Sequence, residues 1–364
     1  MAGKPLRALV VGTGFGCRIQ VPAFRGAGYE VVGLVGSDPQ RTAERAAANG
    51  VDMFFTDLAK AISATRPDVV AISTTPHTHG PLTLQALDMG CHVLCEKPFA
   101  RDAGEARKML AAAERAGKVH MIGNEFRFVP QRSATARAIS GGAIGEPRFA
   151  SFIQVGGYIK AWEQYFPDWW FDPAQGGGWL GASSSHWLDQ IRVWFGEFHS
   201  VSASLNAVTL SRGPVEDTFA VRFTMENGLE GVLQQCSGAY GPMFDSNHIA
   251  GSAGHIWFDN EGLHFADANG ERELPVPADL ELPPPPPLTQ DPRNQRFDWQ
   301  AMAYVEIAPY TELCKAMAAA IRGEQAPSPV PPATFADGVA HMQVLDAIRT
   351  SARNGGAMVR VAAM

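Results

Sequence analysis

A glycine-rich loop follows the first apolar run of the chain. The run Ala8–Val11 is typical of a strand, and Gly-Thr-Gly-Phe-Gly-Cys at residues 12–17 leads into a helical pattern. Gly12 permits a tight turn, and Gly14 lets the backbone approach a pyrophosphate, which the N–H groups of a helix N-terminus can bind. Cys17 takes the third position of this fingerprint, where Gly or Ala is usual, and it is small enough for close packing. The loop therefore predicts dinucleotide binding, with a structural glycine turn as the less favoured alternative.

Strand and helix patterns alternate over the first third of the chain at steps of about 20–30 residues. The apolar run Asp68–Thr74 is typical of a buried strand. The segment Asp38–Gly50 starts with Asp-Pro and ends at a glycine, as helices often do. Parallel strands joined by right-handed helical crossovers form a doubly wound sheet. We therefore predict an α/β Rossmann domain over residues 1–124.

The pattern changes after Asn124. Strand-like runs separated by short turns dominate, and an Asn-Gly pair at residues 227–228 between two alternating runs is a hairpin signal. One helix near Ser183–Phe195 interrupts these runs, and more helix follows Pro309. This pattern predicts an α+β domain over residues 125–364 with a large, mostly antiparallel, open-faced sheet.

The composition is that of a globular protein with two domains. The chain has 364 residues, of which 46% are apolar and 18% charged. Its net charge of -7 argues against a nucleic-acid surface, and it has no run of about 18 apolar residues that could span a membrane. Five scattered cysteines favour reduced thiols in the cytoplasm over a disulfide framework. His77 and His79 lack a Cys or carboxylate cluster beside them, so we expect no metal.

The end of the second expected strand decides which dinucleotide binds. An acid there would hold the ribose 2′-hydroxyl of NAD, but the position is Gly36, and Asp38 before Pro39 is typical of a helix cap. Ser37 can donate a hydrogen bond to a 2′-phosphate, and Arg41 lies one turn into the helix, where it can pair with that phosphate. The pattern favours NADP over NAD. The alternative is a solvated Arg41 and an Asp38 that reaches the ribose.

Several further motifs resemble one known family. The triplet Glu-Lys-Pro at residues 96–98 ends a strand within the run ALDMGCHVLCEKP, residues 86–98. Three glycines at 176–178 precede His186, and the run TFADGVAHMQVLDAIRTSARNG occupies residues 334–355. With the glycine loop, these motifs resemble the Gfo/Idh/MocA family of oxidoreductases over nearly the whole chain. The resemblance implies a Rossmann domain, an open-faced C-terminal domain, NAD or NADP as cofactor, and hydride transfer involving sugars, polyols and related carbinols.

Lys97 resembles the family's active-site lysine beside the nicotinamide. A lysine at the carboxyl end of a parallel strand points into the crevice where ligands bind, and its cation can polarise a substrate oxygen. A surface ion pair with Glu96 is the less favoured alternative, because adjacent residues of a strand face opposite ways. The expected cofactor contacts, from the glycine loop, the second strand and the resemblance together, are Gly12, Gly14, Phe15, Ser37, Arg41, Thr74, Thr75, Pro76, His79, Glu96, Lys97 and Asn124.

The helix after the glycine triplet carries the expected acid/base group. In the family pattern an Asp on this helix is followed by a His four residues later and by another Asp three further on. Here His186 and Asp189 match the last two, but Ala182 stands at the first position. A histidine suits proton transfer because its pKa lies near neutrality. We expect His186 to act with the active-site lysine and with support from Ser183; acid/base function from Tyr158, or loss of activity, are the alternatives.

The region before this helix is rich in aromatic residues, which can wall a substrate pocket or fill a core or subunit interface. The expected substrate contacts are Arg127, Tyr158, Trp170, Ser183 and His186. The predicted function is NAD(P)-dependent hydride transfer at a secondary alcohol or ketone carbon of a sugar, polyol, glycoside or bulkier aromatic-containing substrate. The alternatives are redox-assisted elimination or glycosidic cleavage with a recycled cofactor, and a non-catalytic dinucleotide-binding protein. An open sheet face predicts a homodimer or homotetramer.

Overall fold

The structure of the protein is a computed structural model that describes residues 4–157, 163, 166–208, 212–259, 262–285 and 297–363. The chain forms two units, each built from more than one stretch of sequence. The first unit consists of Met1–Ala100, Gly104–Val129 and Leu282–Gly338. The second consists of Arg101–Ala103, Pro130–Glu281 and Val339–Met364.

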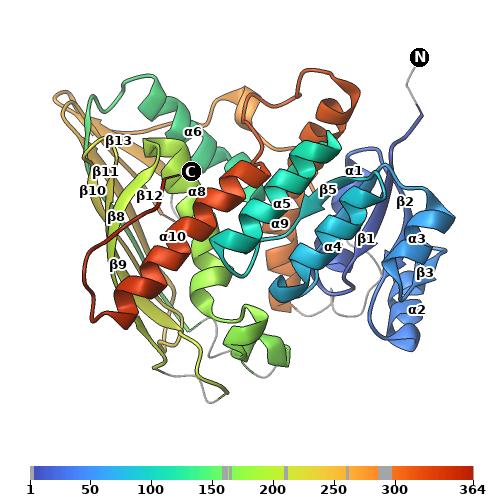
Figure 1. Ribbon diagram of the computed structural model, residues 1–364. Helices are drawn as coiled ribbons and strands as arrows, with labels where there is room; N and C mark the ends of the chain where they lie inside the picture. Colours follow the sequence, from blue (N-terminus) through green and yellow to red (C-terminus); the bar gives the residue numbers. More distant parts are fainter. Residues whose placement is uncertain are drawn as a thin grey trace. The chain divides into compact units, whose positions relative to one another are not determined.

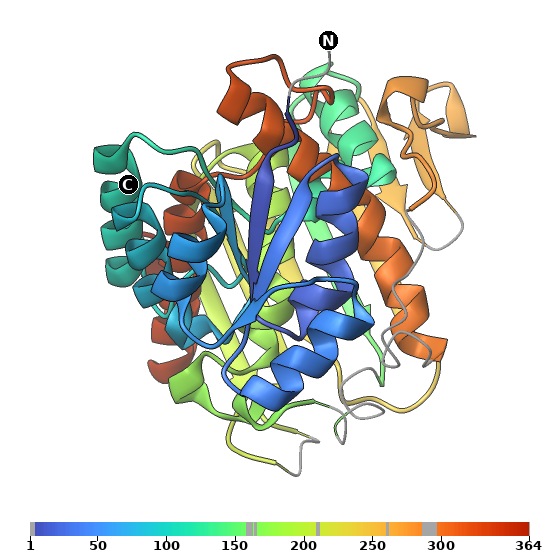
Figure 2. The ribbon, with the colours of Figure 1, turned by 90° about the vertical axis from the view of Figure 1, so that its right-hand side faces the viewer.

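Six parallel strands in the order β3-β2-β1-β4-β5-β6 form the sheet of the first unit (Figure 1). This order confirms the predicted doubly wound Rossmann sheet. Figure 2 shows β1 and β2 side by side in the darker blues. The strands are β1 (Arg7–Val11), β2 (Glu30–Val35), β3 (Phe54–Phe55), β4 (Val69–Ile72), β5 (His92–Cys95) and β6 (His120–Ile122). The helices between and after them are η1 (Gly16–Gln20), α1 (Val21–Gly26), α2 (Pro39–Ala48), α3 (Leu58–Thr65), α4 (Pro76–Asp88), α5 (Ala103–Ala116) and η2 (Glu125–Phe128).

A long helix from the last third of the chain, α9 (Phe297–Arg322), completes this unit. Its apolar side chains are buried in the same core as those of β1 and α1. Ile307, Tyr310, Leu313 and Cys314 follow the three-to-four-residue spacing of a helix face, and all are fully buried. Sequence analysis placed this helix only after Pro309, whereas the helix begins well before it. The predicted domain boundary after residue 124 also assigns this helix to the second domain, whereas in the structure it belongs to the Rossmann unit.

Nine strands form the sheet of the second unit, in the order β14-β13-β12-β11-β7-β10-β9-β8-β15. Only β7 and β10 pair in parallel among the strand pairs that the described residues form, so the predicted, mostly antiparallel sheet is confirmed. The predicted Asn-Gly turn joins β9 to β10, and Gly228 has a φ of +88°. The strands are β7 (Pro147–Val155), β8 (Phe198–Asn206), β9 (Thr218–Met225), β10 (Glu230–Cys236), β11 (Phe244–Gly251), β12 (His255–Phe258), β13 (Leu263–Asp267), β14 (Gly270–Glu273) and β15 (Val359–Arg360).

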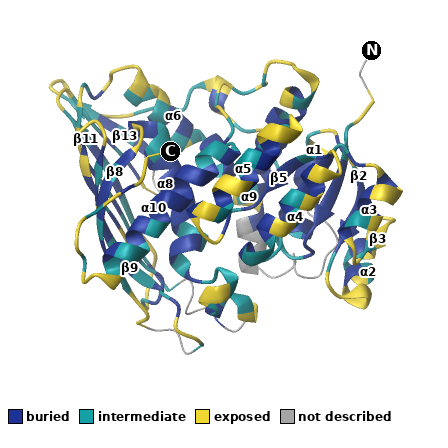
Figure 3. Ribbon diagram, viewed as in Figure 1, coloured by how far each residue is buried: buried dark blue, intermediate teal, exposed yellow. Residues whose placement is uncertain are grey.

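The second unit contains one helix that sequence analysis missed. The prediction of a single helix before Pro309 in this part of the chain is wrong, because α6 (Pro130–Ser140) precedes β7 and packs on α8 (Ser185–Phe195). The segment has few apolar residues and no clear helical apolar stripe, so its pattern gave no signal. The remaining elements are η4 (Asp168–Phe171), η5 (Pro173–Gln175), η6 (Leu180–Ser184), η7 (Ala278–Leu280) and α10 (Phe335–Arg353). Figure 3 shows that α8 is buried along most of its length.

Two further observations bear on thiols and membranes. All five cysteines are free, and four of them are buried. Within the described ranges of the chain, no helix is long and apolar enough to cross a membrane.

Candidate active site

The glycine loop after β1 packs tightly against the end of β4. Gly12 has a φ of +112°, and a Cβ added to it would lie 2.5 Å from the carbonyl oxygen of Ser73. A Cβ on Gly16 would lie 2.7 Å from Cγ1 of Val10. Around Gly14, no described atom beyond its chain neighbours lies within 4 Å of such a Cβ, so its backbone is open on that side. An open backbone just before η1 and α1 fits the pyrophosphate of a dinucleotide.

The end of β2 has no room for a carboxylate. A Cβ on Gly36 would lie 2.3 Å from Oγ1 of Thr42 and 2.7 Å from Cγ2 of Thr13, so a side chain there would force these residues to move. Asp38 caps α2, because its Oδ1 accepts a hydrogen bond of 2.7 Å from the backbone N–H of Arg41. Nη2 of Arg41 lies 3.5 Å from Oγ of Ser37, and both side chains are exposed. The structure thus brings Ser37 and Arg41 together and assigns Asp38 to the cap.

A second arginine of α2 holds the glycine loop, and sequence analysis did not foresee it. Nη1 of Arg45 donates hydrogen bonds of 2.6 Å to Oγ1 of Thr13 and of 3.1 Å to its carbonyl oxygen. Arg45 lies four residues after Arg41, on the same side of the helix. This four-residue spacing from Arg41 was the one feature of the sequence that could have pointed to Arg45.

The loop after β4 lies beside a fully buried histidine. α4 starts at Pro76 after Thr75, and Nε2 of His79 lies 3.2 Å from the carbonyl oxygen of Thr74. Nδ1 of His79 lies 3.1 Å from the carbonyl oxygen of Pro98. Burial lowers the pKa of His79 to about 4, so the ring is neutral near pH 7 and donates from one nitrogen. The neutral ring can donate to only one of these two carbonyl oxygens, so His79 lies between the loop after β4 and the residue that follows Lys97 and hydrogen-bonds one of them.

A buried carboxyl group directly precedes Lys97. Oε1 of Glu96 accepts hydrogen bonds of 2.6 Å from the Tyr310 hydroxyl and 3.2 Å from Nε2 of Gln20. The Glu96 side chain is 5% exposed, and burial raises its pKa to about 7, against the opposing effects of Lys97 and these hydrogen bonds. Lys97 itself is partly buried, and the Lys97–Pro98 peptide bond is cis.

Two more acids lie within electrostatic reach of Lys97. Burial raises the pKa of Glu125, which is 1% exposed and follows Asn124, and the charges of Glu96 and Glu306 raise it further. Burial also raises the pKa of Glu306, and the charge of Lys97 lowers the pKa of both acids. Sequence analysis missed both. Among the described residues, no group of three or more His, Cys, Asp or Glu side chains is arranged to hold a metal ion.

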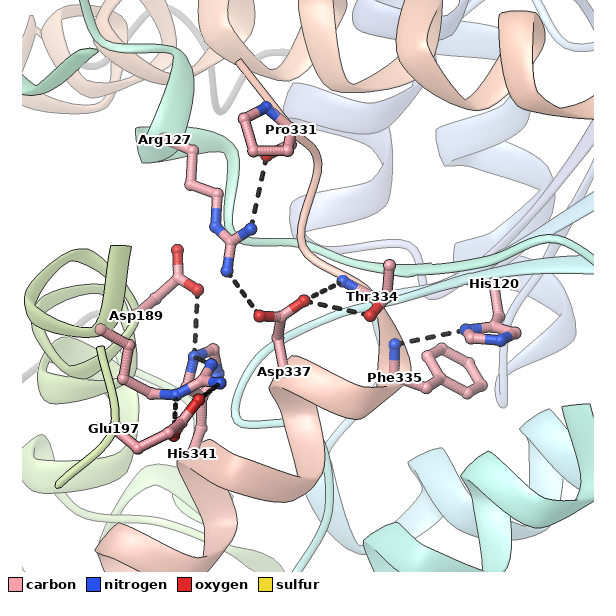
Figure 4. Close-up of polar contacts among 10 residues, drawn as sticks. His120, Arg127, Asp189, Glu197, Pro331, Thr334, Phe335, Asp337 and His341 are labelled. Atoms are coloured by element: carbon pink, nitrogen blue, oxygen red, sulfur yellow. Dashed lines mark hydrogen bonds and ion pairs between the residues drawn. The ribbon is translucent and has the colours of Figure 1, made fainter. Parts of the chain in front are cut away.

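Arg127 is engaged inside the first unit (Figure 4). Its Nη2 lies 2.9 Å from Oδ1 of Asp337, and its Nη1 donates a 3.4 Å hydrogen bond to the carbonyl oxygen of Pro331. The other carboxylate oxygen of Asp337 accepts bonds of 2.7 and 3.0 Å from the backbone N–H and the hydroxyl of Thr334. The Asp337 carboxylate thus holds Thr334 at the start of α10, and Arg127 ties η2 to that carboxylate.

In the second unit, the glycine triplet lets the chain pack closely before α8. A Cβ on Gly177 would lie 2.5 Å from the carbonyl oxygen of Trp170. Gly178 has a φ of +110°, and a Cβ there would lie 2.3 Å from Oε1 of Glu216. That same oxygen accepts a 3.0 Å hydrogen bond from the backbone N–H of Leu180. Glu216 therefore holds the start of the π turn η6, which continues into α8, and π turns are frequent at functional sites.

His186 is the second residue of α8 and is 8% exposed. Ala182 and Ser183 lie in η6 and are partly buried. The Ser185 hydroxyl donates a 2.6 Å hydrogen bond to the carbonyl oxygen of Gly181, so its proton is bound to the backbone of the preceding turn. The structure thus leaves Ser183 as the more accessible serine near His186.

Asp189, one turn further along α8, is paired with a residue from α10. Its Oδ1 lies 3.0 Å from Nε2 of His341 (Figure 4). Arg192 lies beside them, with Nη1 3.4 Å from Nε2 of His341, and it also pairs with Glu197. Sequence analysis did not single out His341, although it lies within the C-terminal run 334–355.

Trp170 belongs to a small aromatic cluster of the second unit. Its ring stacks on Phe166 with the centroids 4.4 Å apart, and Trp179 packs at 6.3 Å. Phe166, Phe171 and Val215 are the buried members of this cluster, and Trp170 is partly exposed at its edge. Tyr158 lies outside the described residues.

A Rossmann unit with an open glycine loop after its first strand is typical of dinucleotide-binding proteins, and here Lys97 lies two residues after the end of β5. Residues 6–124 match the model of the oxidoreductase family with an NAD-binding Rossmann fold, and residues 133–257 match the GFO/IDH/MocA C-terminal domain. The chain therefore belongs to the GFO/IDH/MocA family of oxidoreductases.

The chain is also similar to several named dehydrogenases and reductases. The chain is 31% identical to the D-apiose dehydrogenase of Paraburkholderia graminis over 245 residues, which span 64% of this chain and 61% of that enzyme. It is 28% identical to the 1,5-anhydro-D-fructose reductase of Ensifer adhaerens over 276 residues, or 71% of this chain and 80% of that enzyme. A solved structure of levoglucosan dehydrogenase in complex with NADH and levoglucosan, 24% identical, has a TM-score of 0.81 over 99% of this chain and 100% of that one. That likeness shows the same fold.

Proposed function

We propose that this protein is an NAD(P)-dependent oxidoreductase that transfers a hydride between nicotinamide and a secondary alcohol or ketone carbon of a sugar or related polyol. The observation that carries this proposal is Lys97 at the carboxyl end of β5, beside buried Glu96 and Glu125 in a Rossmann unit. The relatives are named for sugar substrates, which supports a sugar or anhydrosugar here.

The dinucleotide, when bound, supplies the hydride acceptor or donor at C4 of its nicotinamide. Gly14 would approach its pyrophosphate, because the loop backbone is open there, and Gly12 would allow the tight turn that packs the loop against β4. Ser37 and Arg41 would hold the ribose 2′-phosphate of NADP, and the absence of room for an acid at Gly36 supports this preference. The loop Thr74–Pro76, beside His79, and Asn124 and Phe15 would complete the cofactor contacts.

Lys97 would donate a hydrogen bond to the substrate oxygen and stabilise the negative charge that develops on it. During oxidation the carbinol C–H bond breaks and its electron pair leaves as hydride, while the hydroxyl proton passes to His186. In the reverse direction His186 returns that proton to the oxygen. Ala182 removes the carboxylate that the family pattern places near this histidine, so Ser183 would provide the remaining polar support.

Trp170, at the edge of its cluster, would give the pocket an aromatic wall that suits the face of a sugar ring. Arg127 would hold η2 at the start of α10 through its ion pair with Asp337. A large, mostly antiparallel sheet such as that of the second unit would suit association into a homodimer or homotetramer.

The test is a spectrophotometric panel of D-apiose, 1,5-anhydro-D-fructose, levoglucosan and simple polyols, each with NAD(H) and NADP(H). We expect turnover with at least one sugar, and faster turnover with NADP(H). Dinucleotide binding without turnover across the panel would contradict the proposal in favour of a non-catalytic protein. Product formation without a net change in NAD(P)H would contradict it in favour of redox-assisted elimination.

A further inference from the structure

Tyr310, Gln20 and Glu96 form a closed triangle of hydrogen bonds inside the first unit. The Tyr310 hydroxyl lies 2.6 Å from Oε1 of Glu96, and Nε2 of Gln20 lies 2.8 Å from that hydroxyl and 3.2 Å from Oε1. Tyr310 and Gln20 have no exposed surface. The three side chains come from α9, η1 and the end of β5, so the fold rather than local sequence brings them together.

The surroundings are shaped to hold the Glu96 carboxyl in one place. A Cβ on Gly123 would lie 2.5 Å from its Oε1, so this position needs a glycine. The ring of Phe15, in the glycine loop, packs against the Tyr310 ring with the centroids 5.9 Å apart. Tyr310 therefore contacts both the expected phosphate loop and the residue that precedes Lys97.

The direction of each hydrogen bond is defined by chemistry. The pKa of the Tyr310 hydroxyl is raised well above its usual value, first by burial and then by the charge of Glu96, so it keeps its proton and donates. The Gln20 amide donates to both Tyr310 and Glu96. Both donors favour the ionised form of the carboxyl, and charge-assisted bonds of this kind are about twice as strong as neutral ones.

Other ionisable groups also face Glu96. The charge of Lys97 favours its ionised form, whereas Glu125 opposes it. The groups that interact with Glu96 electrostatically are Cys95 and Lys97 from β5 and its end, Glu125 from η2, and Tyr310 and Cys314 from α9.

We propose that Tyr310 is a positioning residue of the active site: its hydroxyl fixes the Glu96 carboxyl in place, and that carboxyl also accepts a 3.3 Å hydrogen bond from the backbone N–H of Lys97 after the end of β5. This inference rests on the proposed role of Lys97. Tyr310 is not expected to touch substrate. Its effect reaches the reaction through the carboxyl group that it holds.

The test compares Tyr310→Phe with Tyr29→Phe. Tyr29 is a matched control, because it is also buried and its hydroxyl donates a 3.1 Å hydrogen bond to the carbonyl oxygen of Cys314 on the same helix. Two readouts are taken on the full chain: the pH dependence of kcat, and an infrared titration of the Glu96 carboxyl band, identified as the band missing in Glu96→Gln. The second readout requires no substrate.

In Tyr310→Phe we expect the acidic limb of the kcat profile and the infrared midpoint to rise together by about one pH unit, the effect of one lost charge-assisted hydrogen bond. Tyr29→Phe should leave both unchanged, and Gln20→Met should shift both in the same direction by less. An infrared midpoint in Tyr310→Phe equal to that of the wild type would overturn the inference. Full turnover in Lys97→Met would instead overturn the proposed function, whatever the infrared midpoint does.

Discussion

The Asp189 carboxylate lies 3.0 Å from Nε2 of His341, and the two side chains are only 2% and 3% exposed. The pair fastens α8 to α10 one turn after His186. Removing one partner of a buried pair leaves the other charge buried without it. This relationship makes the position of the candidate acid/base residue depend on a residue more than 150 positions later in the chain.

His341→Ala should therefore lower the free energy of unfolding by about 3 kcal/mol and also reduce kcat. Urea unfolding and turnover assays measure the two effects. His199→Ala is the control, because His199 lies 3.3 Å from Glu226 in an exposed pair of the same unit and should change stability by less than about 0.5 kcal/mol. Equal effects of the two substitutions would contradict the role of the buried pair.

Gly178→Ala should disrupt the start of the helix that carries His186. The new Cβ would meet the Glu216 carboxylate at 2.3 Å, at a φ of +110° that side chains rarely adopt, so we expect a loss of about 3 kcal/mol and of most turnover. Gly196→Ala, at the other end of α8, has a φ of +87° but no described atom within 4 Å of the new Cβ. Its ψ of -149° lies in a region that is almost confined to glycine, so backbone strain alone should cost about 2 kcal/mol in thermal or urea unfolding. A Gly178 variant as mild as the Gly196 variant would show that the close packing does not matter.

Arg41→Ala tests the cofactor preference. If Arg41 pairs with a 2′-phosphate, its loss should weaken NADP binding by about tenfold to a hundredfold in calorimetric titration and leave NAD binding almost unchanged. Gln40→Ala, an exposed neighbour on the same helix turn, is the control and should affect neither. A parallel loss of NAD and NADP affinity would place Arg41 outside the 2′-phosphate site.

The raised pKa of Glu96 makes stability depend on pH. The carboxyl titrates near pH 4.5 in the unfolded chain and near pH 7 when folded, so between these values the folded state binds more protons. The free energy of unfolding should fall by up to about 3 kcal/mol as the pH rises through this window and then level off. In Glu96→Gln the free energy of unfolding should not show this decrease between pH 4.5 and 7. In Glu44→Gln, which changes an exposed carboxyl, it should follow the wild-type curve. Parallel curves for the wild type and Glu96→Gln between pH 4.5 and 7 would disprove the shift.

The Rossmann sheet followed from the sequence because its signals are local. The glycine loop, the Asp-Pro helix start and the buried strand Asp68–Thr74 each depend on neighbours within a few residues. The contribution of α9 to the same core could not be inferred this way, because its burial depends on a strand almost 300 residues earlier. The polar helix α6 was not predicted for a different reason: its segment lacks an apolar stripe.

The residues of the candidate site likewise fall into two groups: those that a short motif predicts and those that only the fold reveals. Lys97, His186 and the glycine loop belong to short motifs and could be named from the sequence. The partners that fix them, such as Tyr310 and His341, are single residues inside unrelated helices, and only the folded chain brings them within hydrogen-bonding distance. Hydrogen bonds across more than 100 residues leave no pattern that one sequence reveals.

The most direct test of the central proposal is turnover of Lys97→Met with a sugar and cofactor identified on the wild type, together with cofactor affinity. We expect kcat to fall by at least about a thousandfold, because the substrate oxygen loses the charge that stabilises it, while dinucleotide binding changes by less than about threefold. Turnover near the wild-type rate in this variant would contradict the assignment of Lys97 to the reaction.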